Sequence, residues 1–211
     1  MPTLRSLFTT AALAVTAMVA SPASAANIIG GSTSVTLTSA PVLTSAGLTV
    51  GTTGTATVAL NGDGLPVATF PITGGSTNDQ TGAALISHDG SGLSFSNGLG
   101  ALLNIGNFVI DTSALTVNGY ASANGGAASN LTLFNLGSGN TLLLSSGAAS
   151  AFNSVFGLNL AAGTQIGVAQ VNPITAAAAV PEPSTWALML FGFGAAGVAI
   201  RRQRRMALAA A

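Results

Sequence analysis

Apolar and polar residues alternate along much of this chain, and no other feature restricts its fold as strongly. Val35 and Leu37 take every second position among threonines and serines, and Ala56, Val58 and Leu60 do the same further along. Successive side chains of an extended strand point to opposite faces, so a period of two allows one face to be buried while the other meets solvent. The pattern predicts a mainly β fold.

Glycine, asparagine and proline mark the ends of these strands. Residues 61–64, Asn-Gly-Asp-Gly, predict a hairpin turn because Asn and Gly tolerate positive φ. The next strand, residues 67–72, contains or adjoins Pro66 and Pro71, and this predicts an edge strand because proline cannot donate a ladder hydrogen bond. Residues 74–82 predict a loop.

The second half of the chain repeats the alternation in short runs, and each run predicts a strand with one apolar face. The alternating pairs are Leu93 and Phe95, Leu103 and Ile105, Phe108 and Ile110, and Leu115 and Val117; further strands are predicted at residues 131–136, 141–144 and 165–171. Such a succession is typical of an antiparallel meander.

One helical pattern interrupts the meander. Its apolar residues are Ala149, Phe152, Val155 and Phe156. Their spacing places them on one face of a helix, for which Ser145 or Ser146 predicts the start and Gly157 the end. The predicted fold is therefore an antiparallel β-sandwich or flattened barrel with one short helix. A β-solenoid is the alternative, although the sequence has no fixed-period repeat.

The N-terminus has the features of a secretory signal peptide. Arg5 is its only charge, residues 7–20 are an apolar run, and Pro22 ends any helix. Ala23 and Ala25 supply the small residues that signal peptidase requires. We expect residues 1–25 to be removed by cleavage before Ala26.

The C-terminus contains a second apolar run. No charge occurs between Glu182 and Arg201, and residues 186–200 are almost entirely apolar. As a helix, residues 183–200 would extend roughly 27 Å against a bilayer core of about 30 Å, which predicts a transmembrane helix at about 184–200. The cluster that follows would hold its end on the cytoplasmic side. This cluster consists of Arg201, Arg202, Arg204 and Arg205.

This segment resembles the bacterial PEP-CTERM sorting signal in its PEP-x-x-W-A variant. The matching residues are Pro181, Glu182, Pro183, Trp186 and Ala187, followed by the apolar run and the arginines. The resemblance implies recognition by exosortase, a membrane cysteine protease that removes or processes the tail during export. It also implies a Gram-negative host that secretes exopolysaccharide, and an inner-membrane precursor whose product reaches the cell surface or extracellular matrix. An ordinary membrane anchor that nothing cleaves is the alternative.

These signals divide the chain. We expect a signal peptide at residues 1–25, an exported β-rich domain at 26–171, a linker at 172–180, and a sorting signal at 181–211. The expected partners are signal peptidase, exosortase, the membrane, and extracellular polysaccharide.

Charge within the exported part excludes several functions. Its only charged residues are Asp63, Asp79, Asp89 and Asp111. Without Lys or Arg it cannot neutralise phosphates, which excludes nucleic-acid binding and makes anionic lipids poor partners. The absence of cysteine from the sequence excludes disulfides and thiolate metal sites.

Candidate chemistry is sparse. His88 could act as a general base or metal ligand beside Asp89, but residues 89–92, Asp-Gly-Ser-Gly, predict a turn, and adjacent residues on a strand point to opposite faces. Asp63 and Asp79 could bind calcium, yet they lack the spacing of a known calcium loop. No catalytic residue, metal site or cofactor is therefore predicted.

The expected function is that of a non-enzymatic exported protein of the cell surface or extracellular matrix. A carbohydrate- or calcium-binding surface module is the alternative. A glycosidase is disfavoured because its site would need aromatic platforms and polar sugar contacts, and the exported part has no tryptophan and one tyrosine, Tyr120.

Overall fold

The computed structural model of the chain describes residues 25–78, 81–176 and 183–209. It divides into two units, Met1–Ala176 and Ala177–Ala211, each of which is described by itself. Of the predicted signal peptide only Ala25 is described, and Asp79 lies outside the described residues.

Eleven strands of the first unit form one sheet. The first half contains β1 (Ala25–Thr36), α1 (Ala40–Ser45), β2 (Leu48–Gly54), β3 (Thr57–Leu60), β4 (Pro66–Pro71) and β5 (Gly74–Asn78). The second half contains β6 (Ala83–Asn97), β7 (Leu102–Asp111), β8 (Thr116–Ala123), β9 (Ser129–Leu136), the 3₁₀ turn η1 (Ser138–Asn140), β10 (Thr141–Leu144), α2 (Ser146–Phe156) and β11 (Gln165–Thr175).

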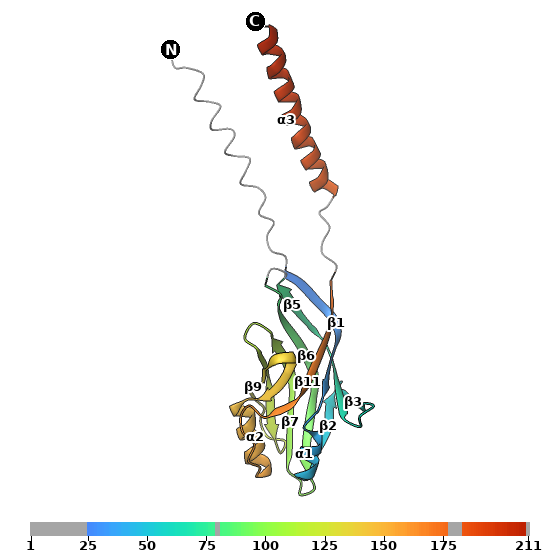
Figure 1. Ribbon diagram of the computed structural model, residues 1–211, viewed down its shortest axis with the longest axis vertical. Helices are drawn as coiled ribbons and strands as arrows, with labels where there is room; N and C mark the ends of the chain where they lie inside the picture. The colour runs from blue at the N-terminus through green and yellow to red at the C-terminus, as the bar shows by residue number, and fades with distance from the viewer. Residues whose placement is uncertain (1–24, 79–80, 177–182, 210–211) are drawn as a thin grey trace, which may run out of the picture. The chain divides into compact units, whose positions relative to one another are not determined.

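The sheet closes on itself through its first and last strands, which lie side by side (Figure 1). β11 pairs with β1 from Ile28↔Thr175 to Thr36↔Val168, and the order from β11 through β10, β9, β8, β7, β6 and β5 returns to β1. Each paired neighbour is antiparallel. The predicted class, mainly β with antiparallel strands and few helices, is confirmed, and the antiparallel pairing leaves no place for the β-solenoid alternative.

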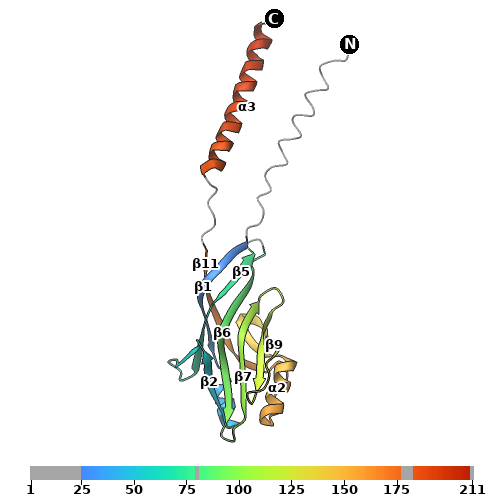
Figure 2. The same ribbon diagram turned by 180° about the vertical axis from the view of Figure 1, so that it is seen from behind.

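β6 pairs with three other strands of this sheet. Its first residues pair with β5 and its last residues pair with β2, while its other edge pairs with β7. Figure 2 shows β2, β6 and β7 side by side. At the β2 end, the chain then passes through β3 to β4, which pairs with β1.

Most of the alternating apolar residues fill the interior as the sequence predicts, but Val58 and Leu60 of β3 are 46% and 71% exposed and Leu115, which precedes β8, is 56% exposed, so the burial predicted for these three is wrong. Leu103 and Ile105 of β7 are buried, as are Leu133 of β9 and Leu144 of β10. Burial of such apolar side chains is the main favourable term in folding this unit, which contains no cysteine to form a disulfide.

Helix α2 confirms the predicted helix together with both of its ends. The Ser145 side chain accepts a hydrogen bond of 3.0 Å from the Ala148 amide, and Gly157 adopts the left-handed conformation at φ 67°. The helix contacts β7, β8 and β9. Phe152 anchors it on the sheet by packing edge-on against Phe95, with ring centroids 4.8 Å apart.

The structure corrects two predictions in the first half. β4 lies between β1 and β3, so the prediction of an edge strand at residues 67–72 is wrong. Pro66 and Pro71 are tolerated because they are the first and last residues of the strand. The predicted loop at residues 74–82 contains β5, which pairs with both β1 and β6 although it lacks apolar alternation.

Two further boundaries differ from the predictions. The separate strands predicted around Leu103 and Phe108 are one strand, β7, whose register with β6 and β8 shifts near Asn107 at φ 50°. Strand β11 continues to Thr175, so the first residues of the expected linker at 172–180 are paired with β1. A linker from 172 would have left one edge of that part of β1 unpaired, while its other edge pairs with β4 and β5.

Candidate functional site

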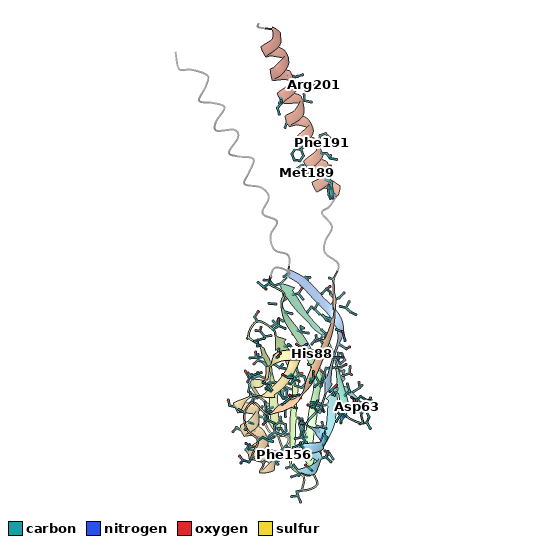
Figure 3. All side chains as sticks on the ribbon, viewed as in Figure 1. Asp63, His88, Phe156, Met189, Phe191 and Arg201 are labelled. Carbon is teal, nitrogen blue, oxygen red and sulfur yellow. The ribbon has the colours of Figure 1, made fainter. Side chains whose placement is uncertain are left out.

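The C-terminal unit contains one helix, α3 (Pro183–Ala209), where the sequence predicts a helix. Proline suits its first position because the amide there has no partner within the helix. Figure 3 shows Met189, Phe191 and Arg201 along it. The apolar side chains are exposed, from 55% for Trp186 to 79% for Phe191. Apolar side chains exposed along a helix in this way are typical of a segment that another apolar surface covers.

Within the described ranges, no helix combines the length and apolar character needed to cross a membrane. The transmembrane helix predicted at about 184–200 is therefore corrected to a helix with an apolar segment. That segment, residues 186–200, is shorter than the roughly 20 apolar residues that a bilayer core requires, and Arg201 and Arg202 continue the same helix.

The structure places the predicted sorting residues together on this unit. Pro183, Trp186 and Ala187 lie in the first turns of α3, and the four arginines follow in the same helix. Pro181 and Glu182 lie outside the described residues, as does Ala23 of the predicted signal-peptidase site. Ala25 is described as the first residue of β1.

His88 is the polar centre of the sheet interior (Figure 3). Its Nδ1 lies 3.1 Å from the Phe108 carbonyl oxygen and its Nε2 lies 2.7 Å from Thr33 Oγ1. Because a carbonyl oxygen can only accept, Nδ1–H is the donor, and Nε2 of the neutral ring accepts from the Thr33 hydroxyl. Burial lowers the pKa of His88 from its ordinary value of 6.5, against smaller opposing effects of the Phe108 carbonyl and Asp89. Both nitrogens of the neutral ring are thus occupied.

A cavity of about 40 Å³ adjoins His88. Thr33, Phe70, Phe108 and Phe134 are among its lining residues, all of which are buried. Ligand pockets for small molecules usually measure about 300–1,000 Å³, so this space is a packing defect in the core rather than a pocket of that kind.

Asp63 and Asp111 lie at turns, whereas Asp89 lies inside β6, so the turn predicted at residues 89–92 is wrong: these residues belong to the strand, at the point where its register with β7 shifts. Asp111 Oδ1 accepts hydrogen bonds from the Ser113 and Ala114 amides, at 2.9 and 3.0 Å, and Asp63 lies in the turn in which Asn61 Oδ1 accepts from its amide at 3.0 Å. Asp89 Oδ2 accepts a bond of 3.3 Å from Thr73. In the portion of the chain that the structure describes, no three acidic, histidine or cysteine side chains gather to hold a metal ion.

The sequence analysis missed Thr33 as the partner of His88. The two residues are separated by 55 positions, and Thr33 belongs to an ordinary alternating strand. Only its inward position in β1 could have indicated a polar residue in the interior, since Thr33 and Val35 share one face.

Comparison with known proteins agrees with the C-terminal geometry. Residues 179–205 match the PEP-CTERM protein-sorting motif. The chain therefore carries the signal of an exported protein that is sorted by exosortase, a membrane protein, which confirms the resemblance found in the sequence. No curated protein matches the chain as a whole.

The fold is similar to a solved structure, the C-terminal domain of HtaA from Corynebacterium glutamicum, with a TM-score of 0.52. The similarity covers 72% of this chain and 99% of that domain, at 12% sequence identity. At so low an identity the similarity concerns the fold alone.

Proposed function

We propose that this protein is a non-enzymatic component of the cell surface or extracellular matrix of a Gram-negative bacterium. Its precursor is held at the inner membrane and processed by exosortase at Pro181–Pro183. The observation that carries the proposal is the match of residues 179–205 to the PEP-CTERM sorting motif, which begins directly after a closed β unit ending at Ala176.

The interior of the β unit favours a structural role over catalysis. A general base needs a free nitrogen within hydrogen-bond reach of its substrate. Both ring nitrogens of His88 instead face protein partners, and the ring is only 1% exposed. Asp111 accepts from the amides of a turn, Asp63 lies within a turn, and the Asp89 carboxylate accepts from the Thr73 hydroxyl.

The outer face of the sheet favours a neutral polymer as partner. It presents hydroxyl and amide groups that bond to one another across strands, as Thr49 does to Ser96 at 2.9 Å and Thr132 to Asn118 at 2.7 Å. Such groups exchange hydrogen bonds with sugar hydroxyls as readily as with water. We therefore assign extracellular polysaccharide as the expected partner of the mature surface.

The test is the intact mass of the protein recovered from its native host. A species that begins at Ala26 and ends at or near Pro181–Pro183 is the expected result. The comparison is with a Pro181→Ala, Pro183→Ala double variant. Exosortase processing would be contradicted if the species that still carries Arg201–Arg205 were as abundant in the wild type as in this variant. The variant is the matched control because it alters the motif and leaves the β unit and the arginines in place.

A carbohydrate- or calcium-binding module remains the second candidate. The hydroxyl-rich outer face favours carbohydrate over calcium as its ligand. Calorimetric titration of the mature domain with calcium, and a glycan array, separate the two roles. Heat release with calcium, or retention of one defined glycan, would favour the binding module; no response to either would favour a purely structural role.

A further inference from the structure

Both termini of the β unit leave the sheet at the same end. Ala25 and Ala26 pair with Asn78 and Thr77 of β5, and the Ala176 amide donates a hydrogen bond of 2.8 Å to the Asn27 carbonyl oxygen. In Figure 1, β1, β5 and β11 meet there. Ala176, at the end of the β unit, is therefore fixed to the first strand.

Three apolar side chains are exposed on the outer face of this end. Ile29 is 64% exposed, Ile174 57% and Leu85 44%. The register of β1 with β11 shifts between Ile28 and Gly30, so Ile29 is an extra residue of β1 beside Gly30, the partner of Ile174. Ile174 faces outward because it follows by two residues Asn172, the partner of Ser32, and Ser32 lies on the face opposite to its buried neighbour Thr33. Leu85 belongs to the row that runs through Ser76 to Asn27, because these residues are paired in turn across β6, β5 and β1.

The burial of the neighbouring residues shows that these side chains are exposed because they lie on the outer face of the sheet. Ile28 and Ile86, the next residues along β1 and β6, are both 3% exposed and point inward. Side chains alternate between faces along a strand, so Ile29 and Leu85 point outward. We call Ile29, Leu85 and Ile174 the terminal apolar surface. Exposed apolar side chains that gather in this way indicate an interaction site.

The length of chain between this surface and the motif identifies the occupant. Ala176 and Pro181 are five residues apart in the sequence, a span of at most about 18 Å. Any protease that grips Pro181–Pro183 while the β unit is folded therefore works within about 18 Å of Ala176. The surface is thus continuous along the chain with the segment that exosortase recognises.

The edge of β11 argues against the addition of a further strand, whether from a second copy of this chain or from another protein. β10 pairs with β11 only as far as Val168, so the following residues have a free edge in the part of the chain that is described. Pro173 lies within this edge and has no amide hydrogen to donate. Proline in an edge strand hinders strand-to-strand addition, which leaves side-chain contact as the available mode.

We propose that the terminal apolar surface is a contact site for exosortase, so that the enzyme binds the end of the folded β unit together with the sorting motif. This inference rests on the proposed function. It adds that exosortase binds chains with a correctly closed sheet in preference to others, because Ile29 and Ile174 come together only when β1 and β11 are paired.

The experiment measures the rate at which precursor is converted to mature protein in the native host after a pulse of labelling. An Ile29→Thr, Ile174→Thr double variant removes the surface but keeps β-branched residues in both strands. A Val58→Thr, Leu60→Thr double variant is the control, since both residues are exposed in β3, at 46% and 71%, and β3 joins the sheet through β4 near Thr36, at the other end of β1 from Ala176. We expect the first variant to be processed about tenfold more slowly, the size of effect that follows loss of an interface anchor, and the control at the wild-type rate.

Melting curves of the purified mature domains accompany these rates. If the double variant melts below the wild type, Leu85→Ser takes its place, because Leu85 lies on a different strand. Slower processing with an unchanged melting temperature supports the contact. Equal rates for wild type, test variant and control would overturn it while leaving the proposed function intact; a wild-type precursor that is never processed would instead overturn the proposed function.

Two additional measurements separate other occupants. One tests the mature domain for binding to vesicles of neutral phospholipid. If the wild type binds and the double variant does not, while both are processed at the same rate, the surface contacts lipid and the proposal is overturned. Likewise, a dimer in light scattering that becomes a monomer in the variant, with processing unchanged, would assign the surface to a second copy.

Discussion

The Nε2 atom of His88 and the hydroxyl oxygen of Thr33 lie 2.7 Å apart in the interior of the sheet. The two residues belong to β6 and β1, which share no backbone pairing. The contact is therefore a polar bridge between strands that are otherwise joined through β5, and in it the neutral imidazole accepts from the Thr33 hydroxyl.

The first prediction concerns pH. The folded pKa of His88 is lowered below 6.5, so the unfolded chain binds more protons than the folded one in the interval just below 6.5. The stability that this neutral histidine contributes is complete above that pH and is lost as the pH falls toward the lowered pKa. We expect the free energy of unfolding to decrease from pH 7 to pH 5, by up to about 1.4 kcal/mol per pH unit.

A His88→Gln variant is the control for this effect. It is expected to be less stable than the wild type at pH 8 but to show a flat profile from pH 5 to 7, because the chain has no other histidine and no cysteine. Thermal melts across this range check the prediction. A variant as acid-sensitive as the wild type would show that another group is responsible.

The second prediction concerns the start of α2. Ser145 Oγ accepts from the Ala148 amide at 3.0 Å and donates to the Thr132 carbonyl oxygen at 2.5 Å. Ser145→Ala should lower the free energy of unfolding by about 1–2 kcal/mol, since an amide and a buried carbonyl both lose their partner. Ser154→Ala, on the exposed face of the same helix, should change it by less than about 0.5 kcal/mol. Urea unfolding measures both, and equal losses would contradict the capping role.

The third prediction concerns close packing at Gly106. A Cβ atom at this position would lie 2.7 Å from the Ser91 carbonyl oxygen and 3.0 Å from Cε1 of Tyr120. Gly106→Ala should therefore cost about 1–3 kcal/mol, because backbone or ring must shift. Gly98→Ala is the matched control, as nothing lies within 4 Å of its Cβ. Comparable urea midpoints for the two variants would show that the approach of Tyr120 is not tight in solution.

The fourth prediction concerns proteolysis. No Lys or Arg occurs between Arg5 and Arg201, so trypsin has no specific site in the β unit, whereas chymotrypsin has many Phe and Leu residues. Mass spectrometry of the unfolded mature protein should find chymotryptic peptides and no specific tryptic ones. Specific tryptic peptides from residues 26–176 would mean that the mature protein differs from this sequence.

Local sequence patterns predicted the elements whose start, end and apolar face are set by residues close together in the chain. The helix from Ser146 to Phe156 has its own cap, its own stop at Gly157 and an apolar face, so the sequence contains all that is needed to place it. The sorting segment was found for a similar reason, since its motif, apolar run and arginines follow one another in order.

Pairing between distant segments could not be predicted in this way. β5 has the sequence Gly-Gly-Ser-Thr-Asn and is a strand only because β1 and β6 supply hydrogen-bond partners on its two edges. The edge-strand prediction for β4 failed because two prolines at the strand ends carry no information about what lies beside its middle. The bond between His88 and Thr33 likewise requires the whole register of β1 and β6.

The pairing of β1 with β11 also sets the timing of folding during export. The N-terminal strand emerges first, but its partner along Ile28 to Thr36 is the last strand to be synthesised. A contact between chain ends is slow to form and cannot form until both ends are present. The ring of strands therefore cannot close before β11 has emerged, and β11 ends only a few residues ahead of the sorting motif.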